Sequence, residues 1–114
     1  MPEEDNDTQD DTQEEISRVI LPNPNKGEMF GIVEKMLGSS RLNVICADGK
    51  TRVGRRPGKI RKRMWMKEGD LVIVKPWSFQ DDRADVTFRY TKTQAAYLSR
   101  NQILPEILDV FKQQ

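Results

Sequence analysis

Hydrophobic and polar positions alternate along much of the chain, with the period of a β-strand that buries one face. The clearest case is the segment 84–90, where every second residue is apolar and the residues between are charged or polar. The segment 42–46 shows the same alternation and leads into Asp48-Gly49, a dipeptide typical of tight hairpin turns. These patterns predict two β-strands, each bounded by a turn.

Three more strands are expected from short segments that end close to glycine or proline. Their ranges are 29–37, 50–56 and 71–74. Five short strands within about 65 residues are typical of a small closed or nearly closed barrel. We therefore expect a mainly β fold built on a five-stranded barrel, with one long charged connection between its third and fourth strands.

The first 25 residues lack this alternation. Residues 1–15 carry eight acidic side chains, no basic one and almost no apolar ones, so they cannot offset the entropy lost on ordering. The run 22–27 contains two prolines, interrupts regular structure and leads into the next segment. We expect a disordered acidic tail and lead-in over residues 1–25, and the barrel over 26–90.

After Tyr90 the apolar spacing changes to that of a helix. Thr91 or Thr93 is suited to cap a short helix, and Pro105 is suited to the first turn of a terminal one. The apolar stripe expected to pack on the barrel is formed by Leu104, Leu108 and Phe111. The sequence thus predicts a C-terminal helical extension over residues 91–114.

Charge and composition narrow the classes of function. The net charge is only +1, but residues 16–114 hold all 19 bases against ten acids, a net charge of +9. There is no run of about 18 apolar residues that could span a membrane. The single cysteine, Cys46, fits a reducing cytoplasm, and the lack of histidine removes the commonest general base and metal ligand. We expect a cytoplasmic monomer without metal or cofactor.

The segment 50–67 is the most basic part of the chain, with nine Lys or Arg residues among 18 and no acid. Like charges this close repel one another, so a polyanionic partner such as RNA would stabilise the fold. Arginine also forms bidentate hydrogen bonds with phosphate oxygens and stacks on exposed bases. Together with two positions near the first turn, the candidate RNA-binding residues are Lys35, Arg41, Arg52, Arg55, Arg56, Lys59, Arg61, Lys62, Arg63, Trp65 and Lys67.

Two features of this segment have alternative interpretations. The basic run could be a solvated charged loop with no partner. Trp65 could stack on a base, or it could pack against the barrel together with its neighbours Met64 and Met66. The sequence leaves both alternatives open.

Several motifs occur in an order that resembles translation initiation factor 1A of archaea and eukaryotes. The matching segments are 35–38, 41–42, 46–49, 58–66, 69–70, 79–86, Tyr90 and 104–105. The resemblance covers roughly residues 26–108. Eukaryotic members carry a basic N-terminal tail and a long acidic C-terminal tail, whereas this N-terminal segment is acidic and the chain ends at Gln114. The sequence is therefore closer to the archaeal form.

The resemblance implies an S1-type OB-fold barrel with short C-terminal helices. It implies binding to the small ribosomal subunit at the aminoacyl (A) site through ribosomal RNA. There the family stabilises initiator methionyl-tRNA and promotes separation of ribosomes into subunits, and other initiation factors are further partners. The family's RNA-contacting surface falls on the basic candidates between Arg52 and Lys67.

Other classes of function have less support from the residues. A single-stranded RNA binder or RNA chaperone of cold-shock type relies on several exposed aromatics, and most of the few aromatics here are expected in the core. A protein-interaction module could use the stripe Leu104, Ile107, Leu108 and Phe111. An enzyme is least supported, because the only compact acid cluster that could hold a metal (Asp81, Asp82 and Asp85) is more typical of a structural turn beside Arg83.

Overall fold

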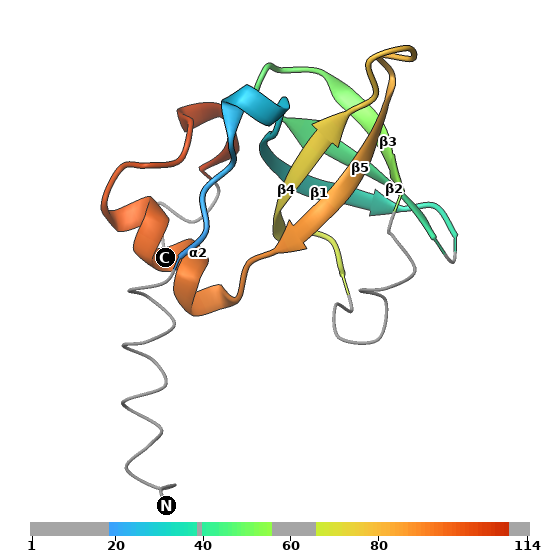
Figure 1. Ribbon diagram of the computed structural model, residues 1–114. Coiled ribbons are helices and arrows are strands. Elements are labelled where there is room, and N and C mark those ends of the chain that lie inside the picture. Colours follow the sequence, from blue (N-terminus) through green and yellow to red (C-terminus); the bar gives the residue numbers. More distant parts are fainter. Residues whose placement is uncertain (1–18, 39, 56–65, 110–114) are drawn as a thin grey trace, which may run out of the picture.

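The computed structural model describes residues 19–38, 40–55 and 66–109, and these form a five-stranded barrel with a short helical extension (Figure 1). The strands are β1 (Met29–Met36), β2 (Arg41–Cys46), β3 (Thr51–Arg55), β4 (Leu71–Pro76) and β5 (Arg83–Arg89). The helical elements are the 3₁₀ turns η1 (Pro24–Lys26) and η3 (Glu106–Leu108) and the α-helix α2 (Lys92–Arg100).

The barrel closes in the order β1-β2-β3-β5-β4, with β4 returning to β1. All neighbouring strands are antiparallel except β3 and β5, which run parallel. This is the arrangement of a five-stranded Greek-key barrel of the OB type. The mainly β barrel expected from the alternation is confirmed.

The interior of the barrel is a tightly packed apolar core. Its fully buried side chains come from alternating positions on the strands and include Val33, Leu42, Val44, Cys46, Val72, Val74 and Val86. At Gly31 a β-carbon would lie 2.5 Å from a methyl group of Val44, so this strand position has room for hydrogen only. The narrow barrel therefore depends on glycine in the middle of β1.

A second core lies outside the barrel, between β1, β4 and the C-terminal segment. Phe30, Ile32, Leu71 and Ile73 project outward from the strands and pack against Tyr90, Ala95, Leu98, Leu104 and Leu108. The strand β4 is thus covered on both faces, which explains why its apolar residues form a continuous run instead of alternating. Leu104 and Leu108 of the C-terminal apolar stripe are buried in this outer core.

The helix α2 begins where the sequence predicted a cap. Thr91 is the N-cap: its side chain accepts a hydrogen bond from the Gln94 backbone, and the Gln94 side chain accepts one from the Thr91 backbone. The expected helix starting at Pro105 is a single 3₁₀ turn, and Asp109 already leaves helical geometry. Burial of Leu108 and a 2.8 Å hydrogen bond from Ser99 to Asp109 fix this end of the turn against α2.

The described part of the lead-in, residues 19–25, is held against the barrel. Val19 packs on the outer core, and the buried Tyr90 hydroxyl donates a hydrogen bond to the Ile20 carbonyl. The run that was expected only to interrupt structure contains η1, capped by the Asn23 side chain, which accepts from the Asn25 backbone. Residues 1–18 of the predicted tail lie outside the described residues.

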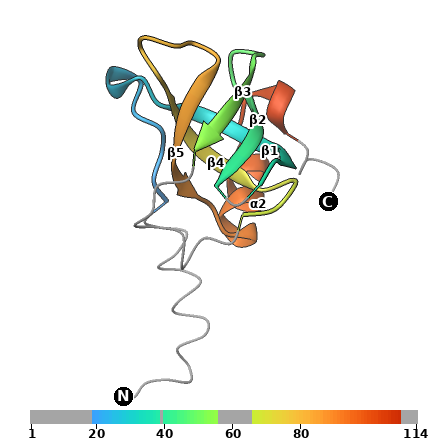
Figure 2. The same cartoon turned by 90° about the vertical axis from the view of Figure 1, so that its right-hand side faces the viewer.

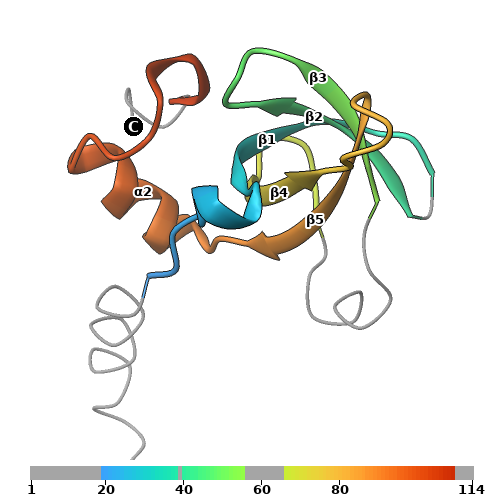
Figure 3. The ribbon, with the colours of Figure 1, turned by 45° about the horizontal axis from the view of Figure 1, so that its top comes forward.

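The views agree on how the elements are arranged (Figures 1, 2 and 3). The helix α2 and the C-terminal segment lie together on one side of the barrel, and the loop between β4 and β5 projects away from them. These two elements therefore leave the opposite face of the barrel uncovered.

Of the helices in the described ranges, none is long and apolar enough to cross a membrane.

The close packing at Gly31 predicts that Gly31→Ala destabilises the protein. The added methyl group would overlap Val44, which is itself fully buried and cannot move aside, so we expect a loss of about 1–3 kcal/mol in the free energy of unfolding. Urea denaturation monitored by circular dichroism measures this loss. Ser78→Ala, in an exposed loop, is the control and should change stability by less than about 0.5 kcal/mol. Equal stability of the two variants would contradict this packing.

Candidate nucleic-acid interface

A row of charged residues crosses the outer face of the barrel over β2, β3, β5 and β4. Arg41 lies opposite Arg55, Arg55 opposite Asp85, and Asp85 opposite Lys75. Residues that face one another across paired strands project to the same side of the sheet. Arg41, Arg55 and Lys75 are exposed, so this row presents three cations and one carboxylate to solvent.

A neighbouring position on β1 adds a fourth cation. Lys35 lies opposite Asn43 and is exposed, and the register of β1 shifts between Val33 and Lys35. Such a bulge re-aims the side chains that follow it. We call Lys35, Arg41, Arg55 and Lys75 the outer basic face. The structure thus brings three of the predicted residues together and adds Lys75, which the sequence analysis did not single out.

The other predicted residues fall elsewhere. Lys67 is exposed and lies in a cleft with Asp70, Leu71, Tyr90 and α2, on the side of the barrel that carries the outer core. Six candidates lie outside the described residues: Arg56, Lys59, Arg61, Lys62, Arg63 and Trp65. For these six the RNA-binding assignment stays a prediction.

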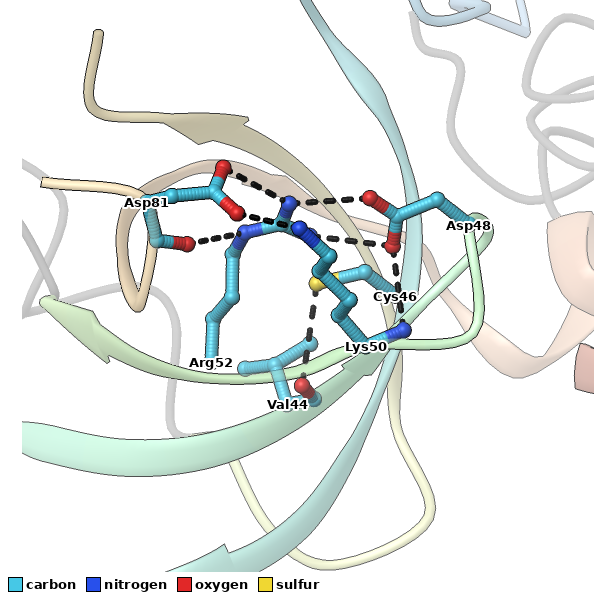
Figure 4. A network of polar contacts seen from close by, with 6 residues as sticks. All are labelled: Val44, Cys46, Asp48, Lys50, Arg52 and Asp81. Carbon is cyan, nitrogen blue, oxygen red and sulfur yellow. Dashed lines mark hydrogen bonds and ion pairs between the residues drawn. The ribbon is translucent and has the colours of Figure 1, made fainter.

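Arg52 differs from the expectation of a phosphate contact. Its side chain is only 3% exposed, because β3 directs it to the inward side, opposite Val44, at one end of the barrel. Its guanidinium donates two hydrogen bonds to the Asp48 carboxylate, at 3.0 and 2.8 Å. It also donates to the carbonyl and the carboxylate of Asp81, at 2.7 and 3.1 Å (Figure 4). The protein itself therefore occupies the donors that a phosphate would need, and we remove Arg52 from the RNA-contacting set.

The charges around Arg52 stabilise one another. The hydrogen bond from Arg52 holds the pKa of the Asp48 carboxyl below its usual value. Hydrogen bonds from Lys50 and then Arg52 likewise lower the pKa of Asp81. Burial raises the pKa of the neighbouring Cys46 thiol, whose sulfur lies 3.6 Å from the Val44 carbonyl oxygen. This thiol is neutral at physiological pH, which disfavours a nucleophilic role.

The acid cluster that was considered as a metal site has other partners. Asp81 pairs with Arg52 and Lys50, and Asp85 pairs with Arg55 at 3.2 Å. The Asp82 carbonyl accepts a hydrogen bond from the Val53 backbone at 2.9 Å. Within the described ranges, no three His, Cys, Asp or Glu side chains are grouped so that they could hold a metal ion. Asp81 and Asp82 join the β4–β5 loop to β3, and Asp85 joins β5 to β3.

Two aromatic residues of the β4–β5 loop complete the surface, and the sequence analysis missed both. Trp77 stacks with Phe79, with ring centroids 5.3 Å apart and an interplanar angle of 28°. The guanidinium carbon of Arg55 lies 5.2 Å from the Trp77 ring centroid, within cation–π range. Phe79 is 81% exposed. The sequence feature that could have identified them is their position: both aromatics follow β4 in a polar turn, outside any apolar alternation.

The Arg52 contacts predict that Arg52→Met destabilises the fold. The substitution keeps an unbranched buried stem but removes four hydrogen bonds, three of them to carboxylate oxygens, so we expect a loss of about 1–3 kcal/mol at neutral pH. Arg55→Met is the control, because Arg55 is 60% exposed in its ion pair and should cost less than about 1 kcal/mol. Urea denaturation of both variants measures the difference. Equal losses would argue against a structural role for Arg52.

The same contacts predict a pH dependence. The folded state lowers the pKa of Asp48 and of Asp81. Their contribution to the free energy of unfolding is therefore fully present above the ordinary aspartate pKa of about 3.9. It is lost as the pH falls through the lowered values. We expect the free energy of unfolding to drop as the pH falls below about 4, and to drop less in Arg52→Met. Parallel profiles for the two proteins would show that Arg52 does not lower these pKa values.

Comparison with protein families and with archaeal proteins gives one consistent result. Residues 16–112 match the family described as translation initiation factor 1A / IF-1. Translation initiation factor 1A of Thermoplasma acidophilum is 67% identical over 103 residues, which is 90% of this chain and 87% of that protein. The same factor of Thermoplasma volcanium is 68% identical over 100 residues, 88% of this chain and 81% of that protein.

A solved structure of another initiation factor is more distant. The solution structure of a translation initiation factor from the Wolbachia endosymbiont of Brugia malayi is 20% identical, with a TM-score of 0.45. It covers 58% of this chain and 79% of that one. The family match and the archaeal relatives span nearly all of the chain, and their class is not enzymatic. The chain therefore belongs to the translation initiation factor 1A / IF-1 family.

Proposed function

We propose that this initiation factor binds the small ribosomal subunit at the A site through ribosomal RNA. In that position it stabilises the binding of initiator methionyl-tRNA, with which it makes no direct contact, and promotes dissociation of ribosomes into subunits. It acts in the cytoplasm as a monomer and associates with other initiation factors. Family membership supports the general assignment, and the outer basic face supports RNA as the ligand.

The single observation that carries the proposal is the side-by-side placement of two exposed cations on β2 and β3, the strands that lie away from α2. Arg41 and Arg55 lie directly opposite each other on β2 and β3, and Asp85 is the one carboxylate in their row. Two adjacent guanidinium groups repel each other in the free protein, and a phosphate chain would relieve that repulsion. The basic segment 56–65 continues directly from Arg55 at the end of β3.

The proposed interface consists of described and undescribed residues. Lys35, Arg41, Arg55 and Lys75 form its described part. The further RNA-binding residues that the proposal includes are Arg56, Lys59, Arg61, Lys62, Arg63 and Trp65. Lys67 lies apart from this interface, in the cleft beside α2 that also contains Lys92 and Arg100. Arg52 acts as a positioning residue, because it joins β3 to the loop that carries Trp77 and Phe79.

The competing functions can be weighed against the same surfaces. The C-terminal stripe that could bind a protein is largely unavailable, since Leu104 and Leu108 are buried and only Ile107 of its described members is exposed. The exposed Phe79 gives the single-stranded RNA binder more support than the composition suggested. A binding experiment should therefore compare intact subunits with generic single-stranded RNA.

We expect tight, salt-dependent binding to purified small ribosomal subunits, weakened by Arg41→Glu/Arg55→Glu. The logarithm of the binding constant should fall against the logarithm of salt concentration with a slope of about −0.7 to −0.9 per phosphate contact, and the double variant should show a shallower slope. Fluorescence anisotropy of labelled protein over a salt series measures both quantities.

The matched control is Lys92→Glu/Arg100→Glu, which makes the same charge change on α2, on the covered side of the barrel. This control should bind subunits nearly as well as the unchanged protein. Equal affinity for subunits and for any single strand would favour the RNA chaperone. Loss of binding in the control alone would place the interface on α2 and contradict the proposal.

A further inference from the structure

We propose that Phe79, stacked on Trp77, is a docking platform for one unpaired nucleobase of the bound RNA. The proposal rests on RNA being the ligand of the outer basic face and names a particular contact within it. The base would stack on the open face of the Phe79 ring, while the neighbouring arginines contact phosphates on either side of that nucleotide.

The aromatic pair is exposed in a way that a core pair is not. Phe79 keeps 81% of its surface in solvent even though one side of its ring stacks with Trp77 at 5.3 Å. By contrast, Phe30 is 8% exposed, packs with Tyr90 and belongs to the outer core. Leaving a phenylalanine ring in water forgoes most of its hydrophobic stabilisation. A base of the bound RNA that stacked on Phe79 would restore this stabilisation.

The loop that carries the pair is preorganised. The Trp77 backbone donates to the Arg83 carbonyl at 3.0 Å, and the Arg83 backbone donates to the Gln80 carbonyl at 3.1 Å, which closes the loop on itself. Arg52 holds the Asp81 carbonyl at 2.7 Å, directly after these residues. A platform fixed before binding loses little conformational entropy when a base stacks on it.

The surroundings favour a nucleobase over an apolar peptide. In the part of the chain that the structure describes, Phe79 is the only large exposed hydrophobic residue on the β4–β5 loop, so it does not belong to a broad apolar patch. Arg55 lies against Trp77, Arg41 lies opposite Arg55, and Lys75 is two residues before Trp77. Carboxylates are also close, but Asp81 is paired with Lys50 and Arg52, and Asp85 is paired with Arg55. An isolated exposed ring beside cations is a combination that proteins use for single-stranded nucleic acid.

The test compares Phe79→Ala with Phe79→Trp, which retains an aromatic ring. Stacking of one base predicts that Phe79→Ala weakens binding to small ribosomal subunits by about 5- to 100-fold, and that Phe79→Trp restores it. The salt slope should be unchanged in both, because neither variant removes a phosphate contact. Ile107→Ala is the control, since it truncates an exposed apolar side chain of the C-terminal segment and should bind normally.

A second measurement identifies the base as the ligand. At low salt, the unchanged protein should bind an eight-nucleotide oligo(A) more tightly than an abasic ribose-phosphate oligomer of equal length, and Phe79→Ala should bind the two equally. No effect of Phe79→Ala on subunits or oligo(A) would overturn this proposal while leaving RNA binding intact. An effect on subunits without any preference for oligo(A) would overturn it in favour of a protein contact. Absence of subunit binding by the unchanged protein would instead reject the proposed function.

Discussion

The hydrogen bonds of the buried Arg52 guanidinium connect the parts of the structure that matter most for function. Arg52 lies on the inward side of β3, and its donors reach Asp48 in the β2–β3 turn and Asp81 in the β4–β5 loop. A guanidinium placed there unpaired would be costly, because a buried charge needs partners that replace water. The two aspartates supply those partners, and in doing so they fix two loops relative to the barrel.

This constraint explains how a narrow barrel presents the rigid surface that we propose faces RNA. The C-terminal segment covers β1 and β4 and forms a second core there, and among the described elements neither this segment nor α2 covers the opposite face. On that face Arg41 and Arg55 project from paired strands, whereas Trp77 and Phe79 project from a loop. A loop in a nucleic-acid interface would ordinarily lose entropy on binding, and its attachment through Arg52 reduces that loss.

The sequence predicted the barrel well because strand alternation and the cap at Thr91 are local signals. It predicted Arg52 poorly, because a cation on a basic strand resembles a solvent-exposed one and its partner Asp81 lies 29 residues away. The inward direction could have been inferred from the hairpin register, which pairs Arg52 with the apolar Val44. Exposure of Phe79 depends on how the β4–β5 loop folds back on β3, and no local pattern encodes that arrangement.

Amide hydrogen exchange, measured by NMR on the unchanged protein and on Arg52→Met, tests the central claim most directly. The Val53 amide joins β3 to the β4–β5 loop through the Asp82 carbonyl, and the Trp77 amide closes that loop through the Arg83 carbonyl. The Tyr90 amide bonds to the Leu71 carbonyl, at the other end of β4 and β5. We predict that Val53 and Trp77 exchange at least about tenfold faster in the variant relative to Tyr90, as expected for local opening. Uniform acceleration at all three amides, or none, would contradict the account in which Arg52 holds the β4–β5 loop in place.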